Sequence, residues 1–192
     1  GSDFSSRFSP WLALGCLSPR TIYEEIKAFE EEHGANQSTY WLFFELLWRD
    51  FFYFIARKWG ARLFHRYGIN PDKANSPKLS DVAESFEKWK LGKTNDDFVN
   101  ANMNELRHTG WMSNRGRQNV ASYLIHDLGV DWRKGAQWFG ENLIDYDPCS
   151  NYGNWLYLSG FGNDPRPDRK FNTQKQAEFY DPDGRYRKFW NQ

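Results

Sequence analysis

Apolar residues recur at helical spacing along most of this chain, whereas the strict alternation that marks a half-buried strand is nearly absent. The pattern predicts helices over approximately residues 20–32, 38–59, 81–91, 96–108, 114–128 and 131–143. Residues 68–80 carry Asn-Pro and Ser-Pro pairs and are expected to form a loop. From Asp145 onward, repeated turn pairs predict long ordered loops with few regular elements. We therefore expect an all-α fold in which residues 1–192 form one domain.

The first two helical segments carry further signals. Ser18 suits the N-cap of the first segment, Pro19 its first helical position and Gly34 its end. The segment 38–59 is apolar nearly all round. A helix without a polar face is typical of the interior, so we expect this one at the centre of the fold.

Composition narrows the class of protein. The 192 residues hold 25 Lys and Arg against 25 Asp and Glu, so no global basic field attracts a polyanion. An apolar share of 40% with balanced charges argues against disorder. Two cysteines, Cys16 and Cys149, are too few for a disulfide scaffold or a zinc site. The 10 Trp, 10 Tyr and 16 Phe exceed what packing ordinarily needs, which hints at a use for aromatic rings in binding.

Membrane and export signals are not evident. The longest apolar stretch, residues 40–55, contains Glu45, Arg49 and Asp50, which argues against a membrane span. No signal peptide opens the chain, and Gly1-Ser2 resembles a remnant of cloning. We expect a soluble, intracellular protein that binds no metal.

Glu45, Trp48 and Arg49 stand at i, i+3 and i+4, so they share one face of a helix that is otherwise apolar. One interpretation is a buried Glu–Arg pair, because buried charges are normally paired. The other is a patch for a flat heteroaromatic ligand, for which a carboxylate, an indole and a guanidinium are well suited. The pattern alone leaves both open.

A second polar face lies on the segment that starts at Asn114, where Arg117 and Gln118 follow at helical spacing. Arg117 is a candidate for a paired charge, with Asp145 or Asp147 as its partner. The default for the neighbouring Arg115 is a solvated side chain.

The segment 145–155 reads Asp-Tyr-Asp-Pro-Cys-Ser-Asn-Tyr-Gly-Asn-Trp and is the richest in polar chemistry. Its carboxylates and amides suit either turn chemistry or a binding site. As a metal site it is weak, since no histidine lies near and the spacing is not that of a calcium loop. No glycine-rich phosphate loop, nucleophile elbow or Cys-His signature occurs in the chain.

Together these motifs resemble the C-terminal FAD-binding domain of the cryptochrome/photolyase family. The resemblance rests on motifs in the same order at residues 4–15, 44–50, 109–119 and 145–155, and it extends over about residues 3–190. Residues 114–118, 147–155 and 162–166 are similar to the DASH branch in particular. The family's N-terminal α/β domain, which holds an antenna chromophore, has no counterpart here.

The resemblance implies a noncovalently bound FAD. Phe4, Ser5, Ser6 and Arg7 would lie at its pyrophosphate, through hydroxyl, backbone and charged groups. Arg49 would frame the cavity.

The same resemblance assigns residues to the flavin end. Asn151 would face flavin N5, and Asp145 would hold Arg117 beside the isoalloxazine ring. Asp147 would lie near the ribityl chain, and Asn114 would also line the cofactor cavity.

The resemblance further implies light-driven repair of cyclobutane pyrimidine dimers in single-stranded DNA. Glu45 and Asn114 would hydrogen-bond the flipped bases, and Trp48 would stack on them. Gln118 and Tyr157 match the DASH branch.

Two further groups of residues follow from the same comparison. Trp155 and Trp132 would be the proximal and middle members of the family's electron-transfer chain. The basic residues that would contact DNA phosphates are Arg115, Arg166, Arg169 and Lys170.

The chain departs from the family pattern in two places. After Trp89 and Gly92, the residues 94–97 read Thr-Asn-Asp-Asp in place of Thr-Gly-aromatic-Pro, and the position of the outermost tryptophan holds Leu79. These departures keep two other functions open. One is a light or redox sensor that signals through a protein partner, and the other is a flavin-free homologue that binds nucleic acid, a protein or a separately supplied chain.

Overall fold

The computed structural model describes residues 5–70, 83–163 and 169–192, and none of these residues forms a strand. The described part of the chain is therefore all-α, as predicted. In order, the α-helices are α1 (Ser9–Ala13), α2 (Pro19–His33), α3 (Gln37–Trp59), α4 (Ala83–Lys90), α5 (Asp97–Thr109), α6 (Asn114–Ser122), α7 (Trp132–Asn142), α8 (Pro148–Ser159), α9 (Thr173–Tyr180) and α10 (Arg185–Trp190). A 3-10 turn, η2 (Gly60–Phe64), follows α3, and a π-helical turn, η4 (Tyr123–Asp127), follows α6.

Polar caps define the helix starts much as the sequence indicates. The Ser18 hydroxyl accepts a hydrogen bond from the backbone N–H of Arg20, Pro19 is the first residue of α2, and Gly34 ends it. Asp96 and Ser113 cap α5 and α6 in the same way, so these two starts also agree with the prediction.

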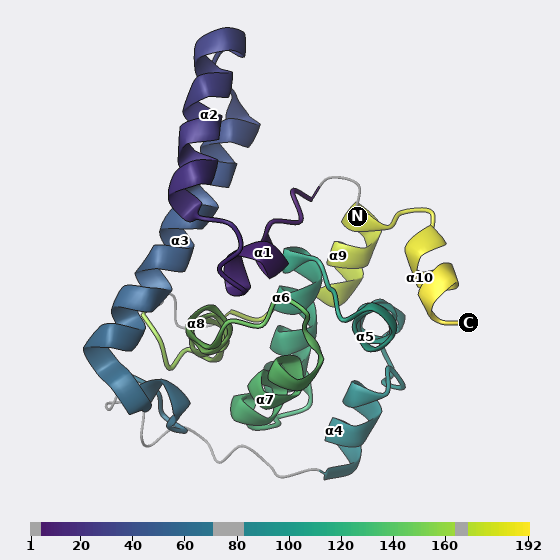
Figure 1. The fold of residues 1–192 in the computed structure, drawn as a ribbon. Coiled ribbons are helices and arrows are strands. Elements are labelled where there is room, and N and C mark those ends of the chain that lie inside the picture. Colours follow the sequence, from purple (N-terminus) through teal and green to yellow (C-terminus); the bar gives the residue numbers. More distant parts are fainter. Residues whose placement is uncertain (1–4, 71–82, 164–168) are drawn as a thin grey trace.

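The main core lies among α4 to α8. In Figure 1, α6 and α7 occupy the middle of this group, and α4, α5 and α8 lie around them. Trp89, Trp132 and Trp155 are almost completely buried there. The ring of Trp155 meets Trp89 at 6.4 Å and Phe139 at 5.2 Å between centroids, each in an edge-to-face arrangement. This aromatic packing holds α7 and α8 in fixed positions on one side of the site.

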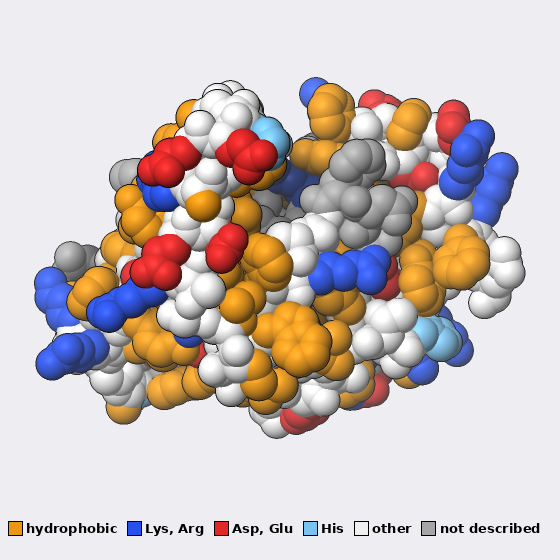
Figure 2. Space-filling model, turned by 45° about the horizontal axis from the view of Figure 1, so that its top comes forward, with side chains coloured by type: hydrophobic (Ala, Val, Ile, Leu, Met, Phe, Trp, Pro, Cys, Tyr) orange, Lys and Arg blue, Asp and Glu red, His pale blue; other side chains and the backbone are white. Residues whose placement is uncertain are grey.

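The expected central position of the second long helix is wrong. In Figure 1, α3 runs along one side of the molecule, and its contacts are chiefly with α2, α8 and η2. Tyr40, Trp41 and Phe54 are 52%, 48% and 67% exposed, and apolar side chains reach the surface over much of the face in Figure 2. An apolar sequence reports only that a helix lacks a polar face, and it does not say how many neighbours surround the helix.

The expectation of long loops after Asp145 is also wrong for the described residues. Asp147 is the N-cap of α8 and Pro148 its first residue, and Gly160 ends α8 in the left-handed conformation with φ 74°. The helices α9 and α10 follow. Pro, Asp and Gly serve both turns and helix ends, so Asp147-Pro148 and Ser159-Gly160 mark the two ends of α8, and Tyr152-Gly153 lies inside it.

The predicted loop 68–80 lies outside the described residues from position 71 onward, as does Leu79. In the divergent segment 94–97, Thr94 and Asn100 bond to each other by side chain and backbone, and Arg187 pairs with Asp97 at 3.3 Å. Among the described residues, no helix is both long and apolar enough to cross a bilayer.

Candidate functional site

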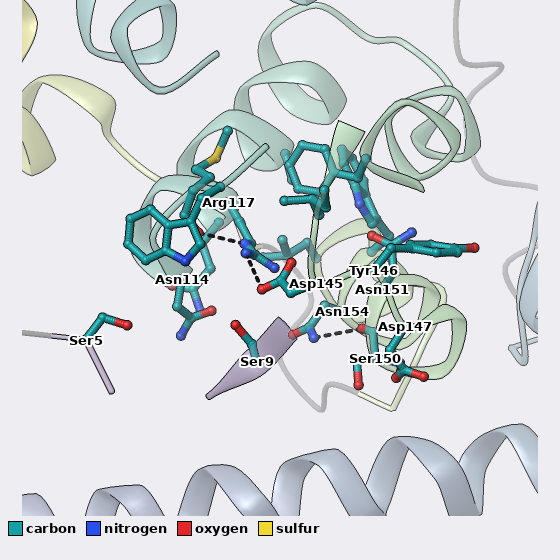
Figure 3. Close-up of a pocket in the computed structure, with 18 residues that line it drawn as sticks. Ser5, Ser9, Asn114, Arg117, Asp145, Tyr146, Asp147, Ser150, Asn151 and Asn154 are labelled. Carbon is teal, nitrogen blue, oxygen red and sulfur yellow. Dashed lines mark hydrogen bonds and ion pairs between the residues drawn. The ribbon is translucent and has the colours of Figure 1, made fainter. Parts of the chain in front are cut away.

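Two adjoining cavities of about 230 and 450 Å³ lie between α3, α6, α8 and the N-terminal segment with α1. Asn114, Arg117, Asp145 and Asp147 line both of them, so the two form one cleft (Figure 3). A combined space of this size is typical of small-molecule and cofactor sites. The cleft gathers residues from segments that are far apart in the sequence.

The Arg117–Asp145 pair lies in the wall of the smaller cavity. One guanidinium N–H of Arg117 donates to Asp145 Oδ2 at 2.8 Å, and its Nε–H donates to the Met112 carbonyl at 2.9 Å. The predicted partner of Arg117 is therefore Asp145 rather than Asp147. The Asp145 side chain is 2% exposed, and its Oδ1 has no hydrogen-bond partner among the described residues. A buried carboxylate oxygen without a partner is costly unless a ligand supplies a donor.

The first turns of α8 supply the adjacent polar groups. Asp147 Oδ2 accepts from the backbone N–H of Ser150 at 2.8 Å, which caps the helix, and Asp147 lines both cavities. The Asn151 amide donates to the carbonyl of Ala136 at 2.9 Å, so α7 orients this side chain in the cavity wall. Trp155 lines the inner end of the same cavity.

On the opposite side, α3 contributes Glu45, Trp48 and Arg49 to the larger cavity. A buried Glu45–Arg49 pair, one of the two interpretations of their spacing, does not form. Arg49 instead stacks over the ring of Tyr53 at 4.7 Å and lies 3.7 Å from Asp50. Protein atoms around the Glu45 carboxyl displace part of its water, and this desolvation raises its pKa. The residue as a whole is exposed.

The remaining predicted substrate residues meet at the larger cavity too. Gln118 and Asn114 reach it from α6, and Tyr157 reaches it from α8. The Tyr157 ring packs edge to face with the Trp48 ring, with 5.8 Å between centroids. The Arg169 guanidinium lies over the Tyr157 ring at 4.1 Å from its centroid. Ser5, Ser6 and Arg7 close the cavity from the N-terminal side, where Arg7 adopts a positive φ of 54°.

Five predicted residues are not among the cleft lining: Phe4, Arg115, Trp132, Arg166 and Lys170. Phe4 and Arg166 lie outside the described residues. Arg115 is exposed, in agreement with the default expectation of a solvated side chain, and its guanidinium donates to Gln118 Oε1 at 2.9 Å and lies over the rings of Phe171 and Tyr180. Trp132 is buried behind the cleft.

Trp132 has its own fixed environment in the core. Its indole N–H donates to the Arg66 carbonyl at 3.0 Å, and its ring meets Tyr152 edge to face at 6.1 Å. Tyr152 lies one helical turn before Trp155 on α8 and is half-buried.

Sequence reasoning missed Ser9, Ser150 and Asn154, which line both cavities. Ser150 and Asn154 follow Asp147 at i+3 and i+7, so a helical interpretation of residues 147–155 would have placed them on one face. Ser9 carries no such signal, because the short α1 was not predicted. No cluster of metal-ligating side chains occurs in the described part of the chain.

Fold and site together define a class of protein: a helical domain with a cleft lined by aromatic, amide and charged side chains. The family description "FAD binding domain of DNA photolyase" matches residues 41–191. The chain therefore belongs to the FAD-binding domain family of DNA photolyases, and FAD is the cofactor of that family.

Individual relatives agree with this assignment. Over 190 residues the chain is 60% identical to Cryptochrome DASH of Danio rerio, and the matched region covers 99% of this chain and 36% of the relative. The crystal structure of the Synechocystis sp. PCC6803 cryptochrome matches with a TM-score of 0.92 and 58% identity, over 99% of this chain and 39% of that one. A class III photolyase from Agrobacterium tumefaciens matches with a TM-score of 0.88 and 35% identity, over 97% and 38%. The chain thus spans little more than a third of the length of these relatives.

Proposed function

We propose that the chain binds FAD in this cleft and uses it for light-driven repair of cyclobutane pyrimidine dimers in single-stranded DNA. The donor set supports FAD: Ser5, Ser6 and Arg7 offer hydroxyl and guanidinium groups suited to a pyrophosphate. The unpartnered Oδ1 of Asp145 suits an N–H donor of the isoalloxazine ring. Trp155 and Asn151 supply a planar and an amide group at the same end of the cleft.

The observation that carries the repair function is the continuity of the two cavities. Asn151 and Trp155, assigned to the flavin end, line only the smaller cavity. Glu45, Trp48 and Tyr157 line only the larger cavity that adjoins it, which also takes in Ser6, Arg7 and Arg49 from the cofactor set. Gln118 lines both. A pyrimidine dimer extruded into the larger cavity would thus be next to the cofactor.

Each side chain of the larger cavity has a role in this proposal. Trp48 offers an indole face for stacking, and base–aromatic stacking contributes about 1–3 kcal/mol per base. Asn114 and Gln118 can donate to base carbonyls. Desolvation raises the pKa of the Glu45 carboxyl, which can accept a hydrogen bond from a base N–H when ionised and donate one to a base carbonyl when protonated.

When bound, FAD supplies the light-driven electron transfer on which dimer splitting depends. The residues of the chain then orient the two partners and exclude water. Trp155, in the cavity wall, and Trp132, behind it, would carry electrons to the cofactor, and Tyr152 extends this aromatic route beyond Trp132. The family's outermost tryptophan position holds Leu79, so Tyr152 is a candidate for its role.

The net charge of this chain is zero, so no broad electrostatic attraction draws a phosphate backbone to it. Of the basic residues considered from the sequence, Arg169 lines the larger cavity, and Lys170 pairs with Asp127 at 2.6 Å. Arg166 lies outside the described residues. Local contacts at the cleft, rather than a broad basic surface, would hold the DNA.

The test begins with the absorption spectrum of the purified chain from about 300 to 700 nm, before and after incubation with FAD and desalting. A single-stranded oligonucleotide with one thymine dimer is then irradiated with blue light in the presence of the reduced protein. We expect flavin bands and light-dependent loss of the dimer. Glu45→Gln should reduce the repair rate about tenfold or more while keeping the flavin bands, and Glu24→Gln, an exposed change on α2, should leave both the repair rate and the flavin bands unchanged.

The outcomes separate the candidate functions. Bound flavin without repair at any dimer concentration would contradict the repair function and indicate a light or redox sensor. A colourless protein that takes up no FAD would contradict cofactor binding itself and leave an interaction module.

A further inference from the structure

Tyr53 lies one helical turn after Arg49 on α3 and lines neither cavity, yet it contacts two residues that do. Its hydroxyl donates to Asp147 Oδ1 at 2.8 Å. Arg49 Nη2 lies 3.5 Å from the same hydroxyl oxygen, and the guanidinium stacks over the Tyr53 ring at 4.7 Å. One tyrosine therefore links a carboxylate of α8 and a guanidinium of α3, both of which face the larger cavity.

The geometry at Asp147 shows what this link determines. Oδ2 of the carboxylate accepts from the backbone N–H of Ser150, and Oδ1 accepts from Tyr53. With both oxygens bound, the carboxylate has one orientation. With only the helix cap remaining, it can rotate about the bond to Cβ while Oδ2 still bonds to Ser150.

The surroundings of Tyr53 also keep its hydroxyl protonated, so that it can donate to Asp147. Desolvation raises the pKa of Tyr53, and the hydrogen bond and the charge of Asp147 raise it further, so the phenol keeps its proton near neutral pH. The hydroxyl therefore remains a donor to the carboxylate, and its oxygen remains available to Arg49.

We propose that Tyr53 is a positioning residue for the cofactor: it holds Asp147 and Arg49 in the orientation that binds FAD. This inference rests on the proposed FAD binding in the cleft. Asp147 presents an oriented carboxylate to ligand hydroxyls, and Arg49 presents a guanidinium held by stacking rather than by a strong ion pair.

A purely structural role would be to tie α3 to α8. That packing has another source, since Phe52 on α3 is buried against Gly153 on α8. Loss of the Tyr53 hydroxyl leaves this contact and the stacked Arg49 in place. The two roles therefore differ in what they predict: a positioning residue affects FAD affinity, whereas a tie between helices affects stability.

The experiment compares wild type, Tyr53→Phe, Asp147→Asn and the double variant. The dissociation constant of FAD is measured by fluorescence titration, and the circular dichroism of the bound flavin reports its orientation. Asn still caps α8, so Asp147→Asn preserves the helix start. Tyr40→Phe is the matched control, because Tyr40 lies on the same helix, is half exposed, and makes no hydroxyl hydrogen bond among the described residues.

We expect Tyr53→Phe to weaken FAD binding about three- to tenfold, less than the loss of a direct hydrogen bond to a charged group would, because Tyr53 acts through Asp147 and Arg49, and to alter the flavin dichroism. In the Asp147→Asn background the same change should have a smaller effect, because the two residues act through one contact. Unfolding of the apo protein should change little.

Three results would overturn the inference while leaving FAD binding intact. They are a dissociation constant for Tyr53→Phe equal to that of Tyr40→Phe, fully additive effects in the double variant, and a loss of stability with unchanged affinity. If the wild type itself binds no FAD, the proposed function fails, and this inference fails with it for a distinguishable reason.

Discussion

Glu105 is a carboxylate that the core holds away from the cleft surface. It is 8% exposed, and burial raises the pKa of its carboxyl. The Tyr186 hydroxyl donates to Glu105 Oε2 at 2.7 Å and opposes that rise, while also lying 3.1 Å from Asn102 Oδ1. A single phenol from α10 thus compensates a buried acid on α5.

This pairing makes the stability of the chain dependent on pH. The folded-state pKa of Glu105 lies above its unfolded value, so its contribution to stability is most favourable at low pH and declines as pH rises through the folded pKa. Tyr186→Phe removes the bond that opposes this rise. We expect a loss of about 1–3 kcal/mol in unfolding free energy near pH 8 and a smaller loss near pH 5, measured by urea unfolding.

The control for this prediction is Tyr180→Phe, which removes a hydroxyl from an exposed ring on α9 and should cost less than about 0.5 kcal/mol at either pH. Equal losses near pH 5 and pH 8 for Tyr186→Phe would show that Glu105 does not titrate in this range.

At the scale of elements, the cleft depends on how closely α8 approaches α3. Gly153 lies in the middle of α8, and a Cβ at this position would lie 2.2 Å from Phe52 Cδ1. Only hydrogen fits in that space. The close approach holds Asp147, at the start of α8, within reach of the residues of α3.

Gly153→Ala should therefore force the two helices apart. We expect a destabilisation of about 1–3 kcal/mol, because overpacking shifts either the Phe52 ring or the α8 backbone. FAD affinity should fall as well, since both walls of the cleft move. Thermal unfolding and a fluorescence titration measure the two effects.

Ser159→Ala, near the end of the same helix and outside both cavities, is the comparison for Gly153→Ala and should keep wild-type affinity. A Gly153→Ala protein with unchanged stability and affinity would mean that the Phe52 ring rotates away at no cost.

At the scale of the whole molecule, the sequence predicts the helices better than their surroundings. The starts of α2, α5 and α6 follow from Ser18, Asp96 and Ser113, because capping is local chemistry. The exposure of α3 could not be predicted, since its apolar residues do not report how many helices pack around it.

The site shows the same division between local and long-range information. Residue type limits the possible partners of Arg117 to two carboxylates, Asp145 and Asp147, and the fold selects Asp145. The contact of Tyr53 with Asp147 joins positions 94 residues apart and leaves no pattern in the sequence. Sequence reasoning thus identifies side chains by chemistry, and tertiary packing decides which of them meet.

Because the cleft joins the N-terminal segment, α3, α6 and α8, a ligand that fills it should stabilise the molecule as a whole. A ligand bound only to the folded state adds about 2.7 kcal/mol at a hundred times its dissociation constant, or roughly 5–10 °C in melting temperature for a chain of this size. At the same ligand concentration, we expect FAD to produce such a shift and riboflavin a smaller one, because riboflavin lacks the pyrophosphate that Ser5 and Arg7 would hold. Asp145→Asn should reduce both shifts, since an amide cannot replace the carboxylate toward Arg117. Equal shifts from FAD and riboflavin would locate binding at the flavin end alone and contradict the role proposed for the N-terminal segment.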